Sequence, residues 1–135
     1  MTIQEKLKDL KELFSMFEDR KDQFIQLMDM AKESGVLSDS EKIDKNKIYG
    51  CTSQAWIVSN KNDNQTYTFR TDSDAMIVKG LLTLLENIFN GQKATDICSY
   101  DSQLILKEIG LDGTITSQRT NGFSNAVEKI KKIIE

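Results

Sequence analysis

The sequence predicts an α+β domain in which a small antiparallel sheet packs against helices. Three observations support this fold class: two amphipathic helical segments open the chain, a pair of β-branched and aromatic segments follows, and helical periodicity then returns. The 135 residues suffice for one hydrophobic core, so we expect a single domain over residues 1–135. Apolar residues make up 39% and charged residues 29%, as in an ordinary globular protein.

Capping residues and apolar spacing predict the first two helices. Thr2 and Glu5 have the separation of a capping box, and apolar residues recur at helical spacing after them. A second helix is expected to begin near Asp19 and to stop at Gly35, a residue type that suits a left-handed C-terminal cap. We expect these two helices to pack against each other as a helical hairpin.

A polar loop and a β-hairpin are predicted next. Residues 36–50 lose periodicity and become polar, although Ile48 and Tyr49 could add a short strand. Residues 55–59 and 66–71 are rich in β-branched and aromatic side chains, and the run between them is turn-forming. The two segments are therefore expected to pair as antiparallel strands.

The remainder of the chain is predicted to be helical. Residues 72–74 offer N-cap candidates for a helix over residues 75–89, which Asn90 and Gly91 end. Apolar residues cover most of its circumference, as in a central core helix. The later elements are expected to be a turn over residues 95–99, a helix over 102–108 closed by Gly110, and a last amphipathic helix carrying Phe123, Val127, Ile130 and Ile134.

Composition limits the partners and the compartment. The formal net charge is −3, so no large positive field favours nucleic acid or anionic lipid. The N-terminus lacks the apolar core of a secretory signal, and residues 75–89 are interrupted by Lys79 and Glu86 and too short to span a bilayer. We expect a cytoplasmic protein with no membrane contact. With two separated cysteines and no histidine, we expect free thiols and neither a metal nor another cofactor.

Cys51 is the candidate catalytic residue. It follows Gly50 and precedes Thr52 and Ser53, ahead of a strand rather than inside an apolar stretch, which indicates an exposed turn. The absence of histidine excludes a Cys-His hydrolase, and Gln54 stands where a Cys-x-x-Cys motif needs its second thiol. A solitary thiol remains, which can attack a partner with a sulfur leaving group.

Three segments resemble the SufE/CsdE family of sulfur-acceptor proteins, which serve cysteine desulfurases in iron-sulfur cluster assembly. Residues 50–58 resemble the family's Gly-Cys-x-Ser-x-Val-Trp signature, residues 72–81 its Asp-Ser-Asp-Ala-x-Ile-Val-Lys-Gly helix start, and residues 117–123 its Arg-x-Asn-Gly turn. The resemblance covers almost the whole chain and implies a SufE/scaffold-like fold. The departures from the family pattern are Tyr49, Ala55 and Ser117.

The resemblance implies transpersulfidation, in which the Cys51 thiolate takes the outer sulfur of a persulfide on the desulfurase. The chain would then stimulate its partner rather than act as a stand-alone enzyme. Pyridoxal phosphate would belong to the desulfurase, and a cluster scaffold or delivery complex would receive the sulfur. Gly50 and Ser53 would support a loop that moves inward and outward. Arg119 either stabilises the thiolate or is a solvated residue at the start of the last helix.

Other interpretations stay open from the residues alone. The chain could be a non-catalytic module that regulates a desulfurase, or a thiol redox sensor that uses Cys51 and Cys98. An iron-sulfur scaffold needs about three thiolates, and two cysteines argue against it. Cys98 is otherwise expected to be a half-buried packing residue. Trp56 is assigned to packing and Asp74 to helix capping.

Overall fold

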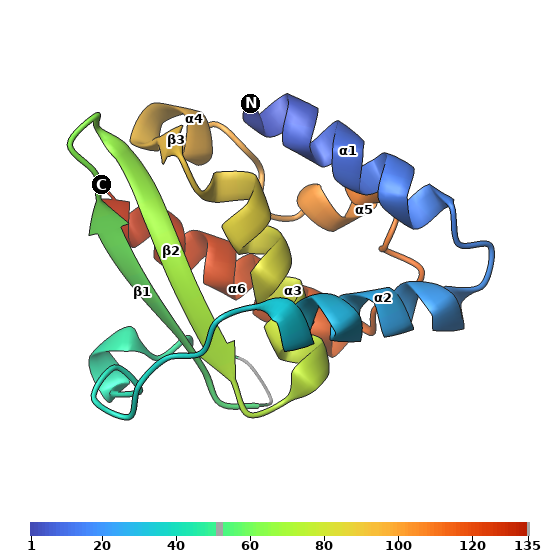
Figure 1. Ribbon diagram of the computed structural model, residues 1–135, viewed down its shortest axis with the longest axis horizontal. Coiled ribbons are helices and arrows are strands. Elements are labelled where there is room, and N and C mark those ends of the chain that lie inside the picture. Colours follow the sequence, from blue (N-terminus) through green and yellow to red (C-terminus); the bar gives the residue numbers. More distant parts are fainter. Residues whose placement is uncertain (51–52, 135) are drawn as a thin grey trace.

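The computed structural model describes residues 1–50 and 53–134 (Figure 1). Helices gather on one face of a small antiparallel sheet, which confirms the predicted α+β class. Cys51, Thr52 and Glu135 lie outside the described residues. In chain order, the elements are α1 (Ile3–Ser15), α2 (Arg20–Glu33), the 3₁₀ turn η1 (Asp44–Asn46), β1 (Ala55–Lys61), β2 (Thr66–Ser73), α3 (Met76–Phe89), β3 (Gln92–Lys93), α4 (Ala94–Cys98), α5 (Ile105–Ile109) and α6 (Ser117–Ile134).

The sheet has the order β1-β2-β3, and all its pairings are antiparallel. The predicted hairpin is confirmed, and each strand continues two residues beyond its predicted end. β3 pairs with the start of β2. A strand of two residues is too short to show the alternating pattern from which strands are predicted. The possible strand at Ile48 and Tyr49 is reduced to an isolated bridge between Lys47 and Trp56. Trp56 is buried, as its assignment to packing predicts.

α3 crosses the inner face of the hairpin and lies at the centre of the molecule (Figure 1). Leu84, Leu85 and Ile88 are completely buried, which confirms the prediction of a core helix. Gly80 lies where α2 approaches α3 most closely, because a Cβ there would overlap the backbone carbonyl of Leu27. A glycine at this position therefore permits close packing of the two helices.

The N-terminal caps of the first two helices form as predicted. Thr2 Oγ1 accepts a hydrogen bond from the Glu5 amide at 3.1 Å, and Glu5 Oε1 accepts one from the Thr2 amide at 3.1 Å. Asp19 caps α2 through the amide of Lys21. The left-handed cap predicted at Gly35 is wrong. The C-cap residue of α2 is Ser34, which is extended, and Gly35 has no positive φ.

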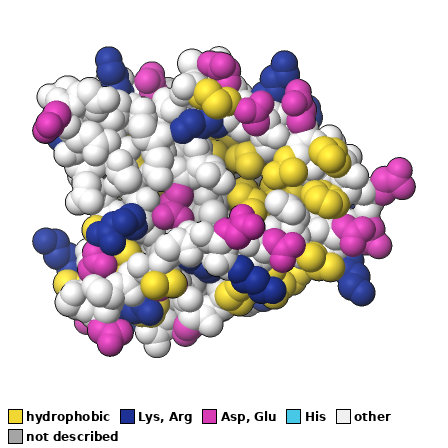
Figure 2. Space-filling view, in the orientation of Figure 1, with side chains coloured by type: hydrophobic (Ala, Val, Ile, Leu, Met, Phe, Trp, Pro, Cys, Tyr) yellow, Lys and Arg dark blue, Asp and Glu magenta, His cyan; other side chains and the backbone are white. Residues whose placement is uncertain are grey.

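The predicted helical hairpin of α1 and α2 is also wrong. α1 packs mainly against α5, whereas α2 packs mainly against α3. The buried side chains of each helix face different partners, and the two helices diverge from the loop that joins them (Figure 1). Hydrophobic side chains consequently gather at the surface between them (Figure 2). Hydrophobic periodicity identifies the face of a helix that is buried, but it does not identify the element that packs against that face.

The polar segment over residues 36–48 covers the outer face of the hairpin. Trp56 and Asp72 are cross-strand partners on this face. The Leu37 amide donates to Asp72 Oδ2 at 3.1 Å, and the Lys42 ammonium lies 3.3 Å from the same oxygen. Lys42 also lies 5.5 Å from the centre of the Trp56 ring, within cation–π range. The segment predicted to be surface loop is therefore attached to the sheet.

Among the helices of the described residues, none combines the length and the apolar character that a bilayer span requires.

Candidate functional site

The chain on the N-terminal side of Cys51 is held against α6. Gly50 has a φ of 87°, a conformation that glycine adopts readily and other residues rarely do. A Cβ at Gly50 would also overlap the side-chain amide of Asn125 in α6. The positive φ is the stronger reason for glycine here, since the Asn125 amide ends a side chain that can move. The part of Gly50 in a loop movement stays a prediction, and Cys51 itself lies outside the described residues.

The chain on the C-terminal side is anchored at the junction of β2 and α3. The Gln54 amide donates to Asp74 Oδ1 at 3.1 Å, and the Gln54 carbonyl accepts from the Asp74 amide at 3.2 Å. The same carbonyl accepts from Ser73 Oγ at 2.7 Å. Ser53, the predicted supporting residue, is half-buried immediately before this anchor. Three hydrogen bonds thus fix where the chain enters β1.

The predicted capping role of Asp74 is wrong. Asp72 and Ser73 belong to β2, and the N-cap of α3 is Ala75, which makes no side-chain cap. The Asp74 carboxylate accepts from the Gln54 amide instead, since pairing of Ala55 with Ser73 brings Gln54 opposite Asp74 just beyond the end of the sheet. A motif that reads locally as a helix start therefore serves a contact across the hairpin.

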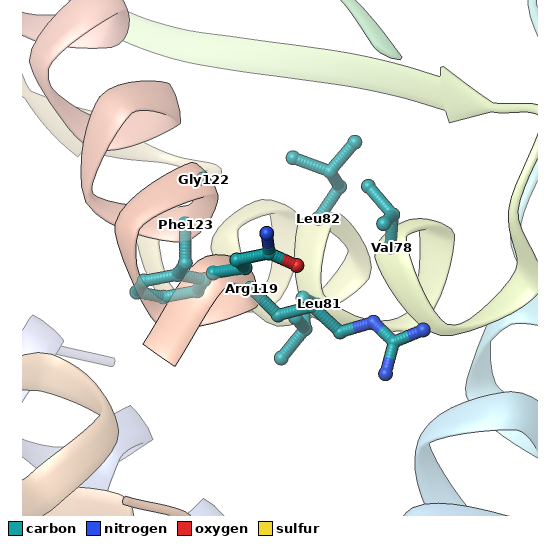
Figure 3. A pocket seen from close by; sticks show the side chains of 7 residues that line it. Val78, Leu81, Leu82, Arg119, Gly122 and Phe123 are labelled. Atoms are coloured by element: carbon teal, nitrogen blue, oxygen red, sulfur yellow. The ribbon is translucent and has the colours of Figure 1, made fainter. Parts of the chain in front are cut away.

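An apolar crevice lies between α3 and α6 (Figure 3). Its volume is about 10 Å³, close to the least that one water molecule needs. Figure 3 shows Arg119 extending from α6 along α3, past Leu81 and toward Val78. Arg119 is half-buried, and its part in stabilising a thiolate stays a prediction. The crevice is lined by Val78, Leu81, Leu82, Gln118, Arg119, Gly122 and Phe123.

One anchor lies in α6 and the other lies just before α3, the two helices that form the crevice. Asn125, which meets Gly50, lies about one turn beyond Gly122 in α6. Asp74, which holds Gln54, lies about one turn before Val78 of α3. The chain that flanks Cys51 is therefore attached to α6 on one side and to Asp74, just before α3, on the other, although neither Asn125 nor Asp74 lines the crevice itself.

A buried charge lies behind this region, and the sequence analysis missed its contact. Lys79 is nearly inaccessible and donates from Nζ to the Thr71 carbonyl of β2. Its Nζ lies 3.9 Å from Glu86 Oε2, which also accepts from Ser34 Oγ. Burial lowers the pKa of Lys79 and raises the pKa of Glu86. The sequence did contain a signal for this contact, because a lysine inside a helix that is apolar on nearly every side must be buried.

The second thiol is exposed rather than half-buried, which corrects the expectation for Cys98. It ends α4, a five-residue helix whose buried side chain is Ile97. Within residues 1–50 and 53–134, no group of three or more His, Cys, Asp or Glu side chains could hold a metal ion.

Comparison with known proteins gives the class of protein first. Residues 8–134 match the family described as SufE, Fe-S metabolism associated domain. An uncharacterised SufE-like protein of Rhizobium etli is 31% identical over 122 residues, covering 88% of this chain and 82% of the relative. Another, from Synechocystis, is 34% identical over 124 residues, covering 92% of this chain and 77% of the relative.

Structural comparison supports the same fold. A hypothetical protein of Thermus thermophilus, solved in solution, superposes with a TM-score of 0.77 at 16% identity, covering 96% of this chain and 93% of that one. The chain therefore belongs to the SufE family, whose domain is associated with Fe-S metabolism. The resemblance drawn from the three sequence segments is confirmed.

Proposed function

We propose that this protein is a cytoplasmic sulfur acceptor, formed by one domain over residues 1–135, that receives sulfur from a cysteine desulfurase onto Cys51. The Cys51 thiolate attacks the outer sulfur of a persulfide on the desulfurase. A new S–S bond forms to Cys51 while the bond from the outer sulfur to the desulfurase cysteine breaks. The desulfurase cysteine leaves as a thiolate, so charge is conserved and no oxidant is needed.

The main support for the proposal is that the chain on the two sides of Cys51 is attached to α6 and to the residues just before α3, the two helices that form the apolar crevice. Gly50 meets α6, and Gln54 is bonded to the residue that precedes α3 by two positions. The apolar crevice has room for about one small atom, which suits a sulfur atom kept from water. Such shielding would protect a persulfide from unwanted reaction before its transfer.

Arg119 is the charged residue of this crevice, and we propose that it stabilises the Cys51 thiolate. Its guanidinium lies along α3, beside the apolar wall (Figure 3). A nearby cation favours the ionised form of a thiol, and the thiolate is the attacking species. Ser53 would act only through the position of the loop. The pyridoxal phosphate of the reaction would reside on the desulfurase.

Mass spectrometry tests the transfer. The protein is incubated with the desulfurase of the same organism and cysteine, and the peptides are examined for one additional sulfur atom. We expect the sulfur on the Cys51 peptide of the wild-type chain and of a Cys98→Ser variant, but not of a Cys51→Ser variant. Sulfur on Cys98 alone, or on neither thiol, would contradict the proposal.

The same variants separate the alternatives. If Cys51→Ser keeps full stimulation of the desulfurase, the chain is a regulatory binding module rather than an acceptor. If mild oxidation joins Cys51 to Cys98 in a reversible bridge, a redox sensor is indicated. We expect instead that Cys51→Ser binds the desulfurase but no longer stimulates it. The recipient of the sulfur would be a cluster scaffold or its delivery complex.

A further inference from the structure

A basic groove lies beside Gly50, on the side of α6 that meets the segment before Cys51. Its volume is about 450 Å³, far larger than that of the apolar crevice. Two separate parts of the chain form it, one on each side. The residues that line this basic groove are Lys47, Tyr49 and Gly50 from the loop, and Asn125, Glu128, Lys129 and Lys132 from α6.

The positive charge of the basic groove is largely uncompensated. Three lysines face one carboxylate, and that carboxylate, on Glu128, lies 3.4 Å from the ammonium of Lys131. Across the part of the chain that the structure describes, neither Lys47 nor Lys132 has an ion pair with a carboxylate. Charge collects here although the chain as a whole has a net charge of −3.

The cations near the hairpin offer a contrast. Lys42, Arg70 and Lys79 each have a carboxylate partner. A lysine near the end of α6 would have an ordinary explanation in the helix dipole, but Lys47 comes from the loop across the groove. The Lys129 ammonium donates to the Lys45 carbonyl at 3.3 Å, which joins the two sides. Helix stability alone does not account for the arrangement.

Tyr49 adds an aromatic contact surface at the edge of the basic groove. Its side chain is exposed, and the Lys47 ammonium lies 5.7 Å from its ring centre. Exposed tyrosines beside cations are typical of residues that dominate binding to a protein partner.

We propose that the basic groove docks a carboxylate-rich surface segment of the sulfur-donating desulfurase. This inference rests on the proposed function, because a donor must reach Cys51, which directly follows Tyr49 and Gly50 in the chain. A chain of net negative charge repels an acidic partner elsewhere on its surface, so Lys47, Lys129 and Lys132 steer that partner toward the thiol. The groove determines the rate and the orientation of docking.

Association kinetics with the purified desulfurase test the proposal. The variant is the full chain with Lys47→Glu and Lys132→Glu, and the matched control is Lys11→Glu with Lys61→Glu, which makes the same charge change at exposed positions elsewhere. At low salt we expect the association rate of the groove variant to fall about tenfold or more, and that of the control to fall much less. The difference should nearly disappear at about 1 M salt, where screening acts within about 3 Å.

Two further measurements keep the outcomes distinct. The rate of Cys51 alkylation by iodoacetamide should be similar in the two double variants, so that a docking defect is separated from a change in thiol reactivity. Equal association rates for the groove variant and the control would overturn the docking surface while leaving the proposed function intact. A wild-type chain that acquires no sulfur on Cys51 would overturn the proposed function itself.

Discussion

The two faces of the β1–β2 hairpin are buried by different means. On the inner face, Ile57 and Phe69 are almost fully buried among apolar residues of the core that includes α3. On the outer face, Asp72 and Arg70 are held by a polar segment through Leu37, Lys42 and Glu41. Apolar burial is insensitive to pH, whereas the outer contacts depend on ionised carboxylates. The stability of the two faces of this one sheet should therefore respond differently to pH.

Lys79 is the exception that connects the two environments. It belongs to the core helix, yet it reaches the Thr71 carbonyl of β2 and lies near Glu86. Thr71 pairs with Ile57 across the strands and so belongs to the inner face. A charged pair, Lys79 and the partly buried Glu86, therefore lies on the side of the sheet that apolar side chains otherwise cover.

The largest effect is expected from Phe69→Ala on the inner face. The ring centres of Phe69 and Tyr67 are 6.2 Å apart in a stacked arrangement, so the substitution leaves a cavity beside Tyr67. It should lower the free energy of unfolding by about 4 kcal/mol. Urea denaturation measures the loss. Phe69→Leu is the control and should lose about 1 kcal/mol. A loss from Phe69→Ala no larger than that of the control would show that the inner face is loosely packed.

A somewhat smaller effect is expected from Lys79→Met, which keeps the aliphatic packing and removes the charge. Glu86 then lacks its cation, and the free energy of unfolding should fall by about 3 kcal/mol near neutral pH. Burial already raises the pKa of Glu86, so its protonated form is favoured in the folded chain. Stability of the variant should therefore decrease as the pH rises and recover partly as it is lowered.

The control for that prediction is the double variant Lys79→Met with Glu86→Leu, measured by the same denaturation. Removing both charges should restore much of the loss. If the double variant is no more stable than Lys79→Met, the loss comes from the Thr71 contact and not from the unpaired carboxylate.

On the outer face, Asp72→Asn should cost about 1–2 kcal/mol near neutral pH, since Asp72 accepts from the Leu37 and Ser73 amides and contacts Lys42. Burial acts to raise the pKa of Asp72, but these three partners outweigh it and hold the pKa below its ordinary value. A carboxyl group whose pKa is lowered on folding stabilises the fold at pH values above its ordinary pKa. This stabilisation is lost as the pH falls through the pKa of the folded state. The gap between wild type and variant should narrow in acid, as measured by denaturation at several pH values. Asp63→Asn, which makes the same change in the exposed turn, is the control variant.

The smallest effect on stability is expected at the exposed pair of Glu41 and Arg70. The hydrogen bond from Arg70 and the Ser38 amide lower the pKa of Glu41 to about 2. Any stabilisation from this pair is present above about pH 4.5 and is lost as the pH falls through about 2. Carboxyl NMR titration should find the low pKa in wild type and a higher one in Arg70→Ala. An unchanged titration in the variant would mean that the pair does not form in solution.

The parts of the fold that the sequence predicted are those in which neighbours along the chain determine the structure. The Thr2 capping box, the hairpin, and the helix ends at Asn90 and Gly91 and at Gly110 all depend on short-range patterns. The hairpin of α1 and α2 was mispredicted because packing partners are chosen in three dimensions. Asp74 was mispredicted because its hydrogen-bond partner, Gln54, is brought to it by strand pairing.

The candidate site divides in the same way. The three segments that resemble the family could be found in the sequence, and membership in the SufE family is confirmed. The chemical role of Cys51 stays a prediction. The basic groove could not be anticipated, because Lys47 and Lys132 are far apart along the chain and meet only after α6 folds against the loop. Individually, each lysine looks like one more hydrated surface charge.

Gly50 shows that sensitivity to mutation does not by itself identify a residue that takes part in chemistry. Its positive φ is a backbone conformation that residues with a side chain adopt only with strain, and the Asn125 amide lies close against it. Most missense changes at this codon should impair the protein, even though glycine carries no reactive group. A saturation mutagenesis survey would therefore rank the position beside the cysteine among the most intolerant, and its intolerance would report backbone shape.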